Sequence, residues 1–186
     1  MLRRVLFFLP LLVSVCACAH KGPWESAMSQ GRHHLEKERY EQARQSYGRA
    51  LELRPGNPEA LMGRAAAEIG LKRLPQALAD MNAAIAVKPR LQWRSRRGML
   101  LYAMGKYPEA LLDLDAVLAA HPHHAPSRAA RGMVNIKMHR CANAAADFRI
   151  ARKRGIPIPQ EWERVCTPPP KQADATDSQE SSPAPQ

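Results

Sequence analysis

Small and apolar residues recur along this chain in a fixed frame. An alanine returns at Ala43, Ala77, Ala110 and Ala144, at intervals of 34, 33 and 34 residues. A large apolar residue follows each alanine at the fourth position, and a small or apolar one at the seventh. Positions four and seven residues apart lie on one face of an α-helix, whereas the proline near the twelfth position cannot continue that helix. The pattern therefore predicts an all-α chain of repeated helical units.

A second small residue stands twelve positions before each alanine, as Gly31, Ala65, Gly98 and Gly132. The missing bulk indicates that the two helices of one unit cross at this point. We expect units at 24–57, 58–90, 91–124 and 125–158. The expected helices cover 24–37, 40–54, 58–71, 74–88, 91–104, 107–120, 125–138 and 141–154. A short helix over 159–166, anchored by Trp162, is expected to cap the open end of the stack.

The segments YEQARQSYGRALELRPGNPEA and MGKYPEALLDLDAVLAAHP, together with the recurring alanine, resemble the tetratricopeptide repeat. The resemblance covers residues 24–158 and implies an α-α solenoid of about four helix hairpins. It departs at Cys141, because the earlier units carry Tyr40, Leu74 or Tyr107 three residues before the alanine. A solenoid of this kind implies binding of another protein rather than catalysis.

The N-terminus has the order of an export signal. Arg3 and Arg4 precede an apolar run over 5–15, which is too short to span a bilayer, and the sequence VCACAH follows. This order resembles the bacterial lipobox. The resemblance implies a signal peptide at 1–17 and attachment of lipid to Cys18.

The same resemblance makes 18–23 a lipidated anchor and short linker. It also implies the periplasmic face of the bacterial outer membrane, because Ala19 stands where inner-membrane retention requires aspartate. Several acyl chains on one cysteine give stable anchoring, since a single chain binds only marginally. The alternative is cleavage at an A-x-A site before His20, which releases a soluble periplasmic protein.

Charge adds a second candidate surface. The chain has 28 Lys and Arg against 17 Asp and Glu, a balance that favours anionic partners. The basic residues cluster at Arg94, Arg96 and Arg97, and again at Arg149, Arg152, Lys153 and Arg154. One interpretation is solvated helix faces, and the other is contact with an anionic glycan or lipid. Nucleic acid is excluded as a partner because aromatic residues are few and are not interleaved with the basic ones.

Two cysteines remain if Cys16 leaves with the signal and Cys18 carries lipid. An oxidising compartment then favours a disulfide between Cys141 and Cys166, which would staple the terminal cap; the alternative is two unrelated buried thiols. From 167 to 186 the chain is rich in Pro, Ser, Gln and Ala, so we expect a disordered tail.

The sequence offers no constellation for catalysis. It contains no nucleophile-elbow serine and no glycine-rich phosphate loop. Glu109, Asp113 and Asp115 are expected to face water. The histidines of the turn HPHH could hold a transition metal only weakly, because no Cys or carboxylate supports the spacing. We therefore expect no enzyme, no cofactor and no metal.

The family resemblance instead implies a concave groove lined by the first helix of each unit. The corresponding residues are Met28, Arg32, Leu35, Met62, Ala66, Ile69, Met99, Tyr102, Met133, Ile136 and Lys137. Methionine recurs in all four units and suits an apolar peptide or helix, although some of these residues could instead belong to the core between repeats. The leading hypothesis is a non-catalytic adaptor that binds another envelope protein; the alternative is a binding module for an anionic glycan or lipid.

Overall fold

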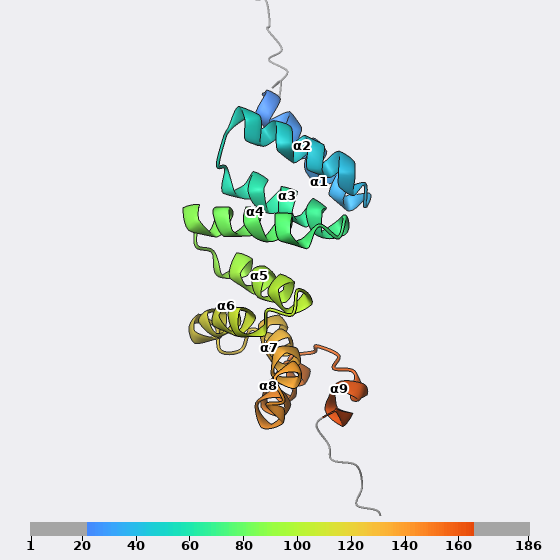
Figure 1. The fold of residues 1–186 in the computed structure, drawn as a ribbon, viewed down its shortest axis with the longest axis vertical. Helices are drawn as coiled ribbons and strands as arrows, with labels where there is room; N and C mark the ends of the chain where they lie inside the picture. The colour runs from blue at the N-terminus through green and yellow to red at the C-terminus, as the bar shows by residue number, and fades with distance from the viewer. Residues whose placement is uncertain (1–21, 166–186) are drawn as a thin grey trace, which may run out of the picture.

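The structure, a computed structural model, describes residues 22–165. This part of the chain forms helices α1 (Pro23–Glu36), α2 (Tyr40–Leu53), α3 (Pro58–Gly70), α4 (Leu74–Val87), α5 (Leu91–Ala103), α6 (Tyr107–Ala120), α7 (Ala125–Lys137), α8 (Cys141–Lys153) and α9 (Gln160–Arg164). Neighbours pair as hairpins α1–α2, α3–α4, α5–α6 and α7–α8, which stack along the long axis of the molecule (Figure 1). The predicted all-α hairpin solenoid is confirmed.

Each hairpin closes where a small residue of its first helix meets a large residue of its second. A Cβ atom on Gly31 would lie 2.8 Å from the ring of Tyr47, and one on Gly98 would lie 3.0 Å from Leu114. Gly132 faces the ring of Phe148 in the same way. The four recurring alanines are at most 1% exposed. The small residues are thus required by close helix packing, as the sequence pattern predicts.

The turn inside each hairpin passes through one residue with a left-handed backbone. Gly105 adopts it in the third hairpin, where φ is 75°. Glu38, Lys72 and His139 adopt it in the other three hairpins, although such angles are uncommon outside glycine. The same backbone geometry therefore recurs with different side chains.

The connections between hairpins are less uniform. Asn57 caps α3 by accepting a hydrogen bond from the backbone N–H of Ala60 at 2.9 Å, and the side chain of His124 caps α7. Arg90 precedes α5 without a side-chain cap, and its connection is one residue shorter. This short connection accounts for the 33-residue interval, and α4 and α5 make a smaller contact than α2 with α3 or α6 with α7.

The C-terminal end is closed by α9. The ring of Trp162 packs against Phe148 at 5.8 Å, and Ile158 is buried beside them. This helix is shorter than expected, but Trp162 anchors it as predicted. Cys141 begins α8, whereas Cys166 lies outside the described residues, so their disulfide stays a prediction.

The predicted signal peptide at 1–17, Cys18 and the tail over 167–186 also lie outside the described residues. Within residues 22–165, no helix is both long and apolar enough to cross a membrane.

Candidate functional site

An apolar pocket of about 290 Å³ lies between α5, α7 and α9. Its lining residues are Tyr102, Met133, Ile136, Lys137, His139, Trp162 and Val165. Tyr102 comes from the end of α5, and Met133, Ile136 and Lys137 share one face of α7 because they are three and four residues apart. Four predicted groove residues therefore gather around one pocket.

The lining is partly open to solvent. Val165 is 65% exposed, whereas Tyr102, Met133 and Ile136 are half-buried. Met99 lies one turn before Tyr102 on α5 and is 48% exposed, so apolar surface continues beyond the pocket. Apolar surface that stays uncovered at a concave site is typical of ligand and peptide binding.

The wall that α9 contributes was not predicted as part of the groove. Trp162 was predicted only as an anchor, and no role was expected for Val165 or His139. Trp162 and Val165 are three residues apart, a helical spacing that was the available signal, although α9 ends at Arg164. The short cap thus also forms one side of the candidate site.

Met28 and Met62 do not line a groove, which corrects the prediction at these two positions. They are 6% and 5% exposed and belong to the hydrophobic core. Each stands fifteen residues before its alanine, whereas Met99 and Met133 stand eleven residues before theirs. Methionine recurs in each unit, but at two different depths in the packing.

The other predicted groove residues lie away from the pocket lining. Arg32 and Ile69 are exposed on α1 and α3. Leu35 is half-buried against the core of the first hairpin, and Ala66 is half-buried on α3. The structure therefore concentrates the candidate groove at its C-terminal half.

The predicted basic patch loses Arg97. Its guanidinium donates to both carboxylate oxygens of Asp113, at 2.6 and 2.7 Å, and to the side-chain oxygen of Asn82 at 2.8 Å. Asp113 is buried, so the expectation that it faces water is wrong. Arg97 and Asp113 were both misplaced for the same reason, because they form an ion pair inside the third hairpin.

The rest of the basic residues lie on two helices. Arg94 is half-buried on α5, and the exposed basic residues are Arg96, Arg149, Arg152, Lys153 and Arg154. Because α5 packs chiefly against α6 and α8 against α7, the two clusters do not form one lining.

The pair between Arg97 and Asp113 belongs to a series that sequence analysis missed. Its members are Arg64 with Asp80, Arg97 with Asp113, and Arg131 with Asp147. Every pair spans sixteen residues, with the arginine thirteen before the recurring alanine and the aspartate three after it. Hydrogen bonding to the aspartate raises the pKa of each arginine above its usual value. Each of these three arginines is therefore paired with an aspartate of its own hairpin.

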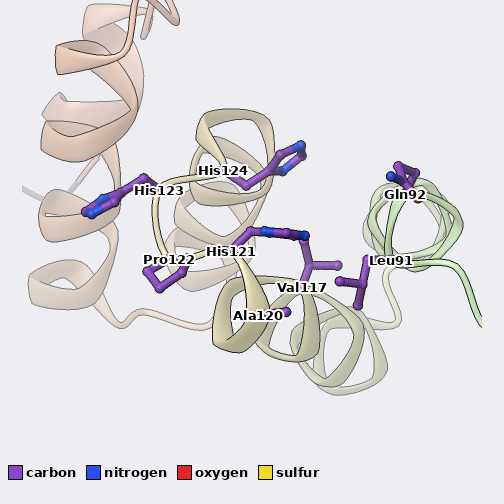
Figure 2. A pocket seen from close by; sticks show the side chains of 8 residues that line it. All are labelled: Leu91, Gln92, Val117, Ala120, His121, Pro122, His123 and His124. Atoms are coloured by element: carbon purple, nitrogen blue, oxygen red, sulfur yellow. The ribbon is translucent and has the colours of Figure 1, made fainter.

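A second cavity, of about 460 Å³, lies between the start of α5 and the turn from α6 to α7 (Figure 2). Its lining is Leu91, Gln92, Val117, Ala120, His121, Pro122, His123 and His124. In Figure 2, the side chain of His123 points away from the other histidines. The Nδ1 atom of His124 lies 2.9 Å from the hydroxyl of Ser127. Within residues 22–165, no group of three or more His, Cys, Asp or Glu side chains could hold a metal ion.

Solved structures share this architecture. MamA from Desulfovibrio magneticus RS-1 aligns with a TM-score of 0.68 at 18% identity, over 72% of this chain and 76% of its own. YrrB, a repeat protein with an unusual peptide-binding site, aligns at 0.65 with 21% identity, over 71% and 69%. PilF from Pseudomonas aeruginosa aligns at 0.65 with 20% identity, over 72% and 61%. Identities this low show a common fold alone.

Sequence comparison gives the family. Small glutamine-rich tetratricopeptide repeat-containing protein 2 of Saccharomyces cerevisiae is 35% identical over 99 residues, which are 53% of this chain and 29% of that relative. The chain thus matches less than a third of the relative's length. The tetratricopeptide repeat model matches residues 28–90 and 95–135, more than half of the chain. The protein therefore belongs to the tetratricopeptide repeat family.

Proposed function

We propose that this protein is a non-catalytic adaptor that binds an apolar segment of a partner protein in the pocket between α5, α7 and α9. The observation that carries this proposal is the gathering of Tyr102, Met133, Ile136 and Trp162 around one partly open pocket. Tetratricopeptide repeat proteins generally bind peptides or other proteins, and the solved protein YrrB has a peptide-binding site.

The size and chemistry of the pocket suit one large apolar side chain. A volume of about 290 Å³ lies near the lower end for ligand pockets. The thioether of Met133 is flexible and accommodates differently shaped apolar groups. Lys137 and His139 stand at the polar side of the lining, so a partner with an acidic residue beside its apolar anchor fits best.

Site-specific crosslinking tests the proposal. A photoreactive amino acid at Lys137 or at Val165 should capture the same partner in intact bacteria, because both positions line the pocket. Leu112 on α6 is the matched control, since it is 72% exposed and does not line the pocket. Equal capture from Leu112 would overturn the assignment of this site. A captured segment should also lose binding to a Val165→Asp variant.

The cellular setting is proposed from the N-terminal sequence. Cleavage after residue 17 and lipid on Cys18 would place the adaptor at the periplasmic face of the outer membrane. Few residues separate Cys18 from α1, which begins at Pro23, so the solenoid would lie close to the bilayer. Labelled palmitate should enter the natural chain and not a Cys18→Ser variant. Absence of label from the natural chain would leave the soluble periplasmic alternative, and equal labelling of both would place the lipid on another residue.

A disulfide between Cys141 and Cys166 belongs to the same proposal. It would join the start of α8 to the chain beyond α9 and so hold the wall formed by Trp162. Closing a loop of this size stabilises a fold by about 2–4 kcal/mol. Mass mapping without reduction, on protein taken from the cell envelope, should find the two residues in one linked peptide. Two free thiols would refute it.

The second candidate function is binding of an anionic glycan or lipid. Arg96, Arg149, Lys153 and Arg154 are exposed and support it, whereas Arg97 does not contribute. Such binding should weaken steeply with added salt, because exposed charges are screened. Burial of an apolar segment should change little with salt, so a salt titration separates the two functions.

A further inference from the structure

The first two hairpins close one end in the same way. In each, a glutamate at the start of the first helix pairs with a basic residue 29 positions later. Glu25 accepts a hydrogen bond from Arg54 at 3.3 Å, and Glu59 accepts one from Lys88 at 3.3 Å. Arg90 adds a second ion pair to Glu59 at 3.2 Å. Carboxylate and cation thus meet across the open end of both hairpins.

The third hairpin lacks this pair. The equivalent positions hold Gln92 and His121, again 29 residues apart, and both residues line the cavity shown in Figure 2. In the fourth hairpin the two positions are Pro126 and Gly155, which carry no ionisable group. The cavity therefore lies where the earlier hairpins place a carboxylate.

The lining of this cavity combines apolar surface with hydrogen-bond donors. Leu91, Val117 and Ala120 supply apolar surface, and His121 and the amide of Gln92 supply N–H donors. No acidic side chain is among the residues that line this cavity. A site that offers donors and apolar surface without a carboxylate is complementary to a carboxylate that carries an apolar body.

We infer that this cavity binds a small organic acid with an apolar body. Its carboxylate supplies the negative charge that Glu25 and Glu59 supply in the first two hairpins, and it accepts hydrogen bonds from Gln92 and His121. Its apolar body lies against Leu91 and Val117. A volume of about 460 Å³ suits a ligand of this size. The site is separate from the pocket between α5, α7 and α9, so it does not depend on the proposed adaptor function.

The test uses octanoate and octan-1-ol as probes with the full-length chain. Calorimetry measures the affinity of each probe, and NMR shifts of Ala120 report whether it binds at the cavity. Octanoate should bind, and octan-1-ol, which has the same apolar body without the charge, should bind at least about tenfold more weakly. Equal affinities, or no octanoate binding at millimolar concentration, would overturn the inference. So would tighter binding of a peptide with a C-terminal leucine than of octanoate.

Two variants assign the binding to the cavity. Gln92→Glu restores the acidic residue of the earlier hairpins, so it should pair with His121, repel the ligand and weaken octanoate binding by about tenfold or more. Ala120→Leu should block the cavity with apolar bulk. Glu59→Gln is the matched control, because it makes the reverse change at the equivalent position of the second hairpin and should leave affinity unchanged. If Gln92→Glu and Glu59→Gln behave alike, the site is not this cavity.

Discussion

The first hairpin and the three that follow have the same helix frame but hold their two helices together differently. Hairpins two to four each contain a buried or half-buried Arg–Asp pair. In the first hairpin the equivalent positions are Gln30 and Ser46, which bond within their own helices, to Ser26 and to the backbone oxygen of Gln42. Tyr47, packed against Gly31 and Gly63, instead supplies the contact. An Arg–Asp pair at these two positions is therefore not required to hold the helices of this hairpin together.

The same difference extends to the contacts between hairpins. Arg97 also donates to Asn82 of the preceding hairpin, and Arg131 donates to Asp115 at 2.6 Å. The residue that would face Arg64 in this way is Gly48, which has no side chain to accept a bond. Arginine side chains that bind the second helix of their own hairpin and that of the preceding one thus join hairpins two, three and four. The first and second hairpins are joined by apolar packing and by an exposed ion pair between Arg73 and Glu41 at 3.7 Å.

The difference between the first hairpin and the others suggests separate roles for the Arg–Asp pairs and for the apolar contacts. Replacing a buried ion pair by well-packed apolar residues is often neutral, whereas removing one partner is costly. The forked guanidinium of arginine fixes direction as well as distance. The comparison therefore indicates that the pairs specify how consecutive hairpins align, while the glycines and large apolar residues stabilise each hairpin.

The largest effect is expected at Asp147, which is 1% exposed and binds both Arg128 and Arg131. Asp147→Ala leaves two guanidinium groups without their buried partner, so the free energy of unfolding should fall by about 3 kcal/mol. Urea unfolding followed by circular dichroism measures it. Ser46→Ala, at the equivalent position of the first hairpin, is the control and should cost less than about 1 kcal/mol. A similar loss of unfolding free energy in both variants would show that the first and fourth hairpins do not differ in this respect.

A smaller loss is expected at Asp80 because its partner Arg64 is more exposed than Arg131. Asp80→Ala should lower the free energy of unfolding by about 2 kcal/mol. The double variant Arg64→Leu/Asp80→Leu should recover most of that loss, since it leaves no unpaired charge. If the double variant is as unstable as the single one, the pair itself stabilises the fold and its role is more than alignment.

How far the sequence predicts this molecule depends on the range of each interaction. The helix frame and the crossing glycines were predictable because each signal lies within one or two helices. Arg97 and Asp113 were misplaced because each was judged alone, as an exposed charge, although their partners lie on the other helix of the hairpin. The pairs would have been found by comparing the residues that stand at the same distance from the alanine in each unit.

The candidate site shows the same limit. Tyr102 and Met133 were predicted from the family's groove positions, and the structure places both at one pocket. Met28 was misplaced because it stands fifteen residues before its alanine, at a position that packs into the core, whereas Met133 stands eleven residues before its own. The wall formed by Trp162 was not predicted as part of the site. The spacing of Trp162 and Val165 indicates a shared face, but their contact with α5 and α7 depends on how the chain turns after α8.

A third experiment installs the missing pair in the first hairpin. Ser46→Asp alone should cost about 1–2 kcal/mol, because it buries a carboxylate without a partner. Adding Gln30→Arg should recover about 1 kcal/mol of that loss, since the new residues occupy the positions of Arg64 and Asp80. A double-mutant cycle in urea measures the coupling. No coupling would mean that the backbone of the first hairpin differs from that of the others at this point.

The smallest effect concerns pH and is confined to the first hairpin, because its large packing residue is ionisable. Burial raises the pKa of Tyr47 above its ordinary value of 10.0, since the phenolate is disfavoured in the core. The unfolded chain therefore releases this proton first, and stability that is complete below pH 10 should be lost as the pH rises above it. Tyr47→Phe should flatten the fall in the urea midpoint between pH 9 and pH 11. Met81, Leu114 and Phe148 occupy the same position in the other hairpins and carry no titrating group, so an unchanged slope in Tyr47→Phe would place the alkaline sensitivity outside this series of residues.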